Sequence, residues 1–185
     1  MNKYELVLML NVSVAEKDRK TFLDELEKKF KMLDKDDIGI KDLSFKLKDK
    51  SDKAYFVSYL FEGESNLLAE IKQSLLYNPN VIRYEIFSRD ENAQFFHFET
   101  LQKTFEAELE KLQDKRYGKK LSFFTKKENE QYLDRKAVSM LKKYQTRFGD
   151  IKPRIYTGNS VKVQKKLRVQ IIRARSLGFL PFIKH

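Results

Sequence analysis

The stretch "AYFVSYLFEGESNLLAEIKQSLLYNPNVIRYEIF", residues 54–87, decides the fold of the first part of the chain. Residues 54–62 are rich in aromatic and β-branched side chains, so they predict a strand that Gly63 ends. Residues 65–79 predict a helix that an Asn-Pro pair stops, and residues 81–87 predict another strand. The apolar face of that helix comprises Leu67, Leu68, Ile71, Leu75 and Leu76.

The residues before this stretch add three more elements. "KYELVLML", residues 3–10, predicts a strand, and "KDLSFKL", residues 41–47, alternates as a half-buried strand does. Between them, Ser13 and Glu16 have capping-box spacing, and a helix is expected to run to about Gly39. Its apolar stripe is Phe22, Leu26, Phe30 and Leu33. The order strand, helix, strand, strand, helix, strand predicts an α+β fold of the ferredoxin-like, split βαβ type.

Composition excludes several kinds of site. The 185 residues contain no Cys and two His, so disulfides and thiolate or His-rich metal sites are excluded, and no cofactor is expected. The residues Asp34, Asp36 and Asp37 lack EF-hand spacing and are expected to form a solvated loop, and His97 is expected to be structural. No apolar run reaches membrane-span length and no presequence is recognised, so we expect a cytoplasmic protein without a membrane partner.

The ferredoxin-like fold hosts many functions and does not choose between them. A phosphatase would need a glycine-rich anion loop after the first strand, and this chain has none there. An RNA-recognition motif would need Gly and Lys or Arg in register on a central strand, which residues 54–61 also lack. No nucleophile and base stand at a motif-like spacing, so we expect neither enzymatic activity nor a small-molecule substrate.

Charge divides the chain into two unlike parts. Residues 1–113 hold 18 Lys and Arg against 22 Asp and Glu, a net charge of −4. Residues 114–185 hold 20 against 5, a net charge of +15. A field of that strength attracts polyanions, and nucleic acid is the commonest such partner.

The second part is expected to be mainly helical. Residues from 98 predict a helix with Leu101, Phe105, Leu109 and Leu112 on one face, and "DKRYGKKLS", residues 114–122, is interpreted as a linker. Residues 129–149 predict a second helix that buries Leu133, Ala137, Met140, Leu141 and Tyr144. We therefore predict a ferredoxin-like domain over 1–90, a helical extension and linker over 91–122, and a basic helical module over 123–185.

The segment from Lys152 to Arg175 has the clearest functional signature. No Asp or Glu occurs in residues 151–185, and a helix is expected to run to about Ser176 after one of the N-caps Thr157, Asn159 or Ser160. Basic rows flank a narrow stripe of Gln164, Leu167, Ile171 and Ala174. Such a helix suits the close phosphates of folded nucleic acid. The candidate RNA-binding residues are Lys152, Arg154, Lys162, Lys165, Lys166, Arg168, Arg173 and Arg175.

Two family resemblances fit this division. The words "KYELVLML" and "LLYNPNVIRYEIF" resemble bacterial small-subunit ribosomal protein six over about residues 2–90. The wording "PRIYTGNSVKVQKKLRVQIIRARSLGFLPF" resembles bacterial small-subunit ribosomal protein eighteen over about residues 119–184. That second pattern is met at Pro153, Arg154, Thr157, Gly158, Lys162, Gln164, Leu167, Ile171, Arg173, Ala174, Arg175, Leu177, Leu180, Pro181 and Phe182. Ile155 and Ile172 stand where the family usually has basic residues, so the resemblance does not imply phosphate contacts at these two positions.

The resemblance implies a fusion of two proteins that form a heterodimer in the platform of the small ribosomal subunit. The implied partners are the central domain of small-subunit ribosomal RNA and neighbouring ribosomal proteins, with the two modules pairing within the chain. The charge asymmetry is consistent with such pairing, since the acidic module can face part of the basic one. The alternative is a ferredoxin-like ligand-sensing regulator with a basic DNA-binding tail.

Overall fold

The computed structural model describes residues 2–46, 52–90, 93–113 and 123–183, with side chains described outside 107–113 and Thr125. The chain forms two units, Met1–Phe95 and Phe96–His185. The predicted linker over residues 114–122 lies outside the described residues.

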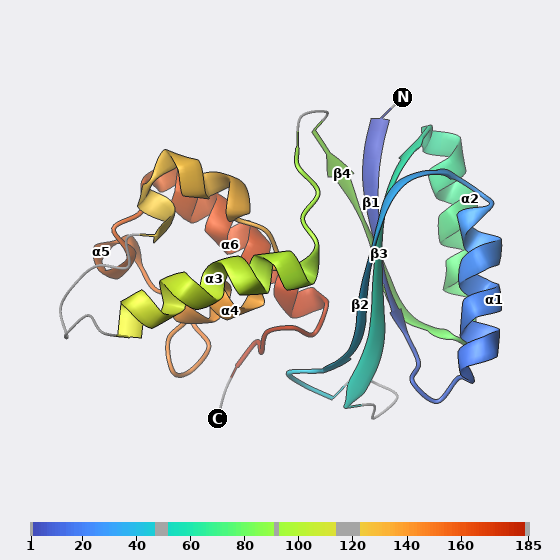
Figure 1. Ribbon diagram of the computed structural model, residues 1–185, viewed down its shortest axis with the longest axis horizontal. Coiled ribbons are helices and arrows are strands. Elements are labelled where there is room, and N and C mark those ends of the chain that lie inside the picture. Colours follow the sequence, from blue (N-terminus) through green and yellow to red (C-terminus); the bar gives the residue numbers. More distant parts are fainter. Residues whose placement is uncertain (1, 47–51, 91–92, 114–122, 184–185) are drawn as a thin grey trace. The chain divides into compact units, whose positions relative to one another are not determined.

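The first unit is a four-stranded antiparallel sheet with two helices on one face (Figure 1). The strand order is β2-β3-β1-β4, so β1 pairs with both β3 and β4. This is the expected ferredoxin-like arrangement, and it confirms the α+β fold class. The strands are β1 (Asn2–Leu10), β2 (Lys31–Asp42), β3 (Lys53–Gly63) and β4 (Val81–Arg89), and the helices are α1 (Glu16–Glu27) and α2 (Ser65–Leu76).

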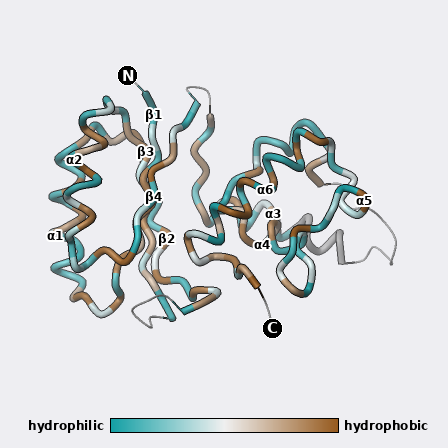
Figure 2. Tube along the Cα trace, turned by 180° about the vertical axis from the view of Figure 1, so that it is seen from behind, coloured by the Kyte–Doolittle hydropathy of each residue, from teal (hydrophilic) through white to brown (hydrophobic). Residues whose placement is uncertain are grey.

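The core of this unit lies between the sheet and the two helices. Alternate residues of β1, among them Leu6 and Leu8, lie in one hydrophobic cluster with Ile71 and Leu75 of α2. The trace of α2 alternates between hydrophobic and hydrophilic colours in Figure 2, as an amphipathic helix on a sheet should. Leu76, which was predicted on the buried face, is 63% exposed. It is the last residue of α2 and lies on a different side of the helix from Ile71 and Leu75.

The first helix ends about ten residues earlier than predicted. Helix α1 stops at Glu27, Phe30 turns into the core, and Leu33 lies 42% exposed on β2. The expected capping box is not formed either, because the N-cap is Ala15, without a side-chain hydrogen bond. The spacing of Phe30 and Leu33 continues the apolar period of the helix, and this extended the prediction too far. Phe30 is buried after the helix has ended, with its ring centroid 4.8 Å from that of Phe61.

The third element is therefore also displaced. Of the predicted strand over 41–47, only Lys41 and Asp42 belong to β2, which starts at Lys31. The three aspartates expected in a solvated loop lie on this strand, and Asp36 is buried. The register of β2 against β3 shifts at Gly39, whose φ is +75° and whose N–H donates to the Asp37 carboxylate at 3.2 Å. A residue with a Cβ would be strained there.

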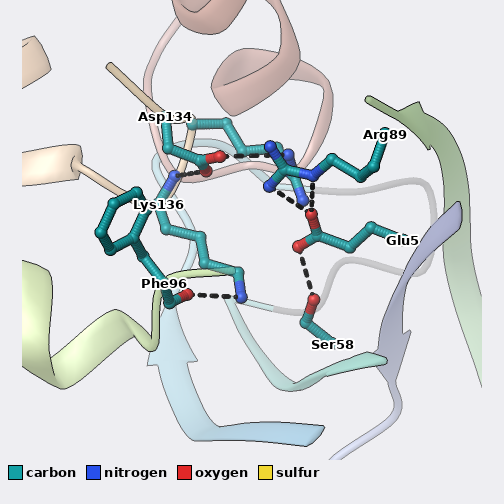
Figure 3. Close-up of polar contacts among 7 residues, drawn as sticks. Glu5, Ser58, Arg89, Phe96, Asp134 and Lys136 are labelled. Carbon is teal, nitrogen blue, oxygen red and sulfur yellow. Dashed lines mark hydrogen bonds and ion pairs between the residues drawn. The ribbon is translucent and has the colours of Figure 1, made fainter. Parts of the chain in front are cut away.

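The sheet also contains a buried charge. Glu5 on β1 is fully buried, accepts a hydrogen bond from Ser58 Oγ at 2.7 Å, and accepts another from Arg89 Nε at 2.6 Å (Figure 3). Three strands thus contribute to one polar network. Removing one of the two charges would break this ion pair, which is strongly destabilising for a buried pair.

The second unit packs helices around an aromatic cluster. Phe105 of α3 contacts Phe123 edge to face at 5.6 Å between ring centroids, and Phe124 lies 5.2 Å from Tyr144. Lys136 is buried and its ammonium donates to the Phe96 carbonyl at 3.1 Å (Figure 3). The helices are α3 (Phe98–Gln113), the 3₁₀ turns η1 (Phe123–Thr125) and η2 (Lys127–Tyr132), α4 (Val138–Lys143), α5 (Arg154–Thr157) and α6 (Val161–Ser176).

The helix predicted over 129–149 is wrong as a single element. The chain forms η2, turns between Leu133 and Ala137, and becomes α-helical only in α4. The Asp134 carboxylate accepts from the Lys136 backbone N–H at 3.0 Å, and this local bond replaces a helical one. All five apolar residues of the predicted stripe are nevertheless buried: Leu133, Ala137, Met140, Leu141 and Tyr144.

The helix expected from residue 98 is confirmed as α3, and its residues Leu101 and Phe105 are buried. It packs within the second unit, where Gln102 Nε2 donates to the Lys136 carbonyl at 3.0 Å. The three-part division of the chain at residues 90 and 122 stays a prediction. Among the described residues, no helix combines the length and hydropathy needed to cross a membrane.

Candidate nucleic-acid interface

Helix α6 provides the frame of the candidate interface. Of the three predicted N-caps it uses Ser160, whose Oγ accepts from the Val163 N–H at 3.3 Å. Gly178, with φ of +76°, follows its C-terminus and donates its N–H to the Arg175 carbonyl at 2.9 Å. The predicted residues Leu167, Ile171 and Ala174 are buried, and Val163 joins them on the same face.

A buried polar cluster holds the preceding loop against α6. The Gln164 Oε1 atom accepts from Thr157 Oγ1 at 3.1 Å and from Asn159 Nδ2 at 3.2 Å. Its Nε2 donates to the Lys152 carbonyl at 2.8 Å. Thr157 and Asn159 are buried, so these two predicted N-caps instead fix the loop that carries Lys152 and Arg154.

Five of the eight candidate RNA-binding residues are exposed, and four of these five are not held in an ion pair within the described part of the chain. Lys162, Lys165 and Arg168 are exposed on α6, and within the described part of the chain none of the three forms an ion pair or hydrogen bond through its side chain. Arg154 is exposed on α5, and its Nε donates to the Asn159 carbonyl at 3.2 Å. Their charges are available to phosphate groups.

The other four are bound more closely to the protein. Lys152 Nζ donates to the Lys143 carbonyl at 2.9 Å, and burial lowers its pKa. Lys166 forms an ion pair with Glu130, and this contact lowers the pKa of the Glu130 carboxyl. Arg175 donates to the Gly149 carbonyl, burial lowers its pKa, and Arg173 is half-buried. An acid from outside residues 151–185 thus neutralises part of the basic segment.

Three of the candidate residues line one shallow groove of about 310 Å³. Arg154, Lys165 and Arg168 meet there with Ile151, Val161 and Gln164. Sequence reasoning missed the apolar members, and the signal that could have found them is Val161, an exposed apolar residue at the start of a basic helix. The combination can bind a phosphate and an apolar surface of the same ligand.

The two departures from the family pattern lie on the surface. Ile155 is 71% exposed and Ile172 is 45% exposed. These two positions therefore present apolar side chains at the surface of the second unit.

The described carboxylates of the first unit do not form a metal site. Across the described ranges, no group of three His, Cys, Asp or Glu side chains is placed to hold a metal ion. Asp37 instead accepts from Tyr55 Oη at 2.6 Å, and Glu27 accepts from Tyr59 Oη at 3.0 Å and from Lys35 Nζ at 2.8 Å. These carboxylates connect α1, β2 and β3.

Comparison with known proteins identifies relatives of the second unit. Residues 129–180 match the family model described as ribosomal protein S18. The small ribosomal subunit protein bS18 of Mycoplasma capricolum is 45% identical over 65 residues, which are 35% of this chain and 85% of that protein. The bS18 of Listeria welshimeri is 43% identical over 68 residues, covering 37% of this chain and 85% of its own length.

The first unit matches a different family. Residues 3–88 match the family model described as ribosomal protein S6. The crystal structure of 30S ribosomal protein S6 from Thermotoga maritima is similar with a TM-score of 0.45 and 18% sequence identity, covering 58% of this chain and 97% of that one. Both expected resemblances are confirmed by the two family matches in one polypeptide. The chain belongs to the ribosomal protein S18 family through its second unit, and it is a fusion with a ribosomal protein S6 domain that precedes it.

Proposed function

We propose that this protein of the small ribosomal subunit binds the central domain of small-subunit ribosomal RNA, in the platform, as a covalently linked pair of an S6 and an S18 module. Membership of two small-subunit ribosomal protein families supports a structural role in the ribosome and disfavours the DNA-binding regulator. The finer placement in the platform and a cytoplasmic ribosome belong to the proposal.

The observation that carries the proposal is the cluster of exposed cations on α6 and α5. Lys162, Lys165 and Arg168 lie within two helical turns, and Arg154 lines the same groove as the last two. Protein cations that neutralise phosphates release counter-ions, so they dominate RNA affinity at low salt. All eight basic residues from Lys152 to Arg175 remain candidates. Arg154, Lys162, Lys165 and Arg168 are candidates for direct contact, and the other four for contact combined with a structural role.

The test compares two triple variants of equal charge. Lys162, Lys165 and Arg168 are each changed to Gln in one, and the exposed residues Lys17, Lys28 and Lys72 of the first unit are changed to Gln in the control. Binding of each full chain to a central-domain RNA fragment is measured over a range of salt. We expect a large loss only in the first variant, and equal losses in both would refute the proposed interface.

Pairing of the two modules is the second part of the proposal. Residues 1–95 carry a net charge of −2 and residues 96–185 one of +13, which favours association of the units. A short tether gives an effective concentration in about the millimolar range, so even a weak pair would stay together before RNA binds.

Cleavage tests the pairing directly. A protease site between Gly118 and Lys119 is cut, and the halves are run on size exclusion at moderate salt without RNA. Co-elution at micromolar concentration supports a true interface, whereas separation would mean that the tether or the RNA joins them.

A further inference from the structure

The groove at the start of α6 has a composition that phosphate binding alone does not need. Arg154, Lys165 and Arg168 supply three cations, while Ile151 and Val161 supply an apolar surface. A site for a duplex backbone requires charge and hydrogen-bond donors, because phosphates and sugars present no apolar face of this size. The apolar part therefore indicates a second chemical group in the ligand.

We propose that this groove holds one unstacked nucleotide of RNA, with its base packed on Ile151 and Val161 and its flanking phosphates on Arg154, Lys165 and Arg168. This inference rests on the proposed RNA-binding function and specifies which part of an RNA the site takes. Proteins that bind RNA sequence-specifically target bulges and loops, because only unstacked bases expose their faces and edges.

The size of the groove agrees with a single nucleotide. Its volume of about 310 Å³ is at the lower end of the range of about 300–1,000 Å³ that small-ligand sites occupy. A base with its ribose fits such a space, whereas a base-paired duplex is too wide to enter it.

The groove is also held in place before any ligand arrives. The Nε atom of Arg154 is fixed by the Asn159 carbonyl, which leaves the two terminal nitrogens of its guanidinium directed to other acceptors. Gln164 is fixed by Thr157, Asn159 and Lys152. Because these side chains are already ordered, less conformational entropy is lost on binding.

The planar guanidinium groups favour RNA over an acidic peptide as the ligand. Arg154 and Arg168 can stack on a base and bind a phosphate through paired N–H groups, which a carboxylate-rich peptide would use only in part. We therefore assign the apolar surface to a base, and an acidic peptide becomes an outcome of the test.

The experiment uses two valines of the same helix in the full-length chain. Val161 lies in the groove and is 50% exposed, and Val169 lies two turns further along α6, outside the groove lining described above, and is 44% exposed. Val161→Ser and Val169→Ser are compared for binding to two RNA hairpins, one with a single bulged 2-aminopurine and one with that base paired. Melting temperatures verify folding, and Val161→Thr provides a variant of nearly unchanged shape.

We expect Val161→Ser to weaken binding of the bulged hairpin about fivefold, which corresponds to ~1 kcal/mol, and to leave the paired hairpin unchanged. Val169→Ser should change neither affinity. Only the unsubstituted chain and Val169→Ser should alter the 2-aminopurine fluorescence of the bulged hairpin strongly on binding. The smaller polarity change in Val161→Thr should give a loss in the same direction.

Three other results would overturn the inference. If Val161→Ser weakens both hairpins equally, or neither, while Arg168→Gln weakens both, the groove binds phosphate only and the proposed function stands. If Arg168→Gln also has no effect on either RNA, the proposed function fails as well. If Val161→Ser lowers affinity for a polyglutamate peptide and not for the bulged hairpin, the groove is a site for acidic peptide.

Discussion

Arg168 and Arg175 allow RNA binding to be separated from folding. Both are arginines of α6, but their side chains differ in burial. Arg168 is exposed, whereas Arg175 is half-buried and donates to the Gly149 carbonyl. The same substitution by Gln at each position should therefore have different effects. Arg168→Gln should weaken RNA binding without loss of stability, and Arg175→Gln should cost stability as well.

The magnitudes follow from these environments. One lost phosphate contact should reduce the log-log salt slope of RNA binding by about 0.7 to 0.9 in Arg168→Gln. Loss of a hydrogen bond to a charged group should lower the free energy of unfolding by about 1.5–3 kcal/mol in Arg175→Gln. For Arg168→Gln we expect a change in the free energy of unfolding within about 0.5 kcal/mol, as for most surface substitutions.

The assays are denaturant unfolding followed by far-UV circular dichroism, and filter binding to central-domain RNA at several salt concentrations. The Lys17→Gln variant, exposed on the first unit, controls for the general effect of removing one charge. Equal destabilisation by Arg168→Gln and Arg175→Gln, or an unchanged salt slope in Arg168→Gln, would refute the separation of roles.

Three further predictions concern stability. Glu5→Gln should lower the free energy of unfolding, measured by urea unfolding, by about 3–5 kcal/mol, because it breaks the buried ion pair with Arg89. Arg89→Met in the same chain should restore part of that loss. Burial raises the pKa of Tyr144 to about 12 from an ordinary value near 10. The stability that this raised pKa contributes is complete below pH 10 and is lost as the pH rises toward 12. Tyr144→Phe should therefore make the free energy of unfolding, measured against pH, flatter between pH 10 and 12. Gly39→Ala should destabilise the first unit by about 1 kcal/mol or more, measured by thermal unfolding, since alanine is strained at positive φ.

The limits of sequence reasoning are clearest at β2. Residues 31–42 contain three Lys and four Asp, residue types that strands usually avoid, and Asp36 is buried. Pairing with β3 along its whole length stabilises this strand, and local propensity does not report such long-range pairing. The other strands and both helices of the first unit were predictable in order because their apolar periodicity is strong.

Contacts that local propensity does not report also explain why the single helix predicted over residues 129–149 is wrong. The apolar residues from Leu133 to Tyr144 were predicted as buried, but the side-chain bond of Asp134 that breaks the helix depends on local geometry. In the candidate interface, charge patterning identified Arg154, Lys165 and Arg168, which the fold brings together in one groove. It did not reveal that Lys166 is paired with Glu130, since 36 residues separate them in sequence.

The hydrogen-bonded cluster around Gln164 shows that positions of the family pattern can have either an internal or a surface role. Thr157 and Gln164, which helped to identify the chain, are bonded to each other inside the protein, while the atypical Ile155 is on the surface. These internal hydrogen bonds hold the loop in place against α6, independently of the side chains at the surface. Substitutions at exposed positions such as Ile155 and Ile172 should therefore alter the surface of the second unit while the cluster keeps the geometry of the loop and α6.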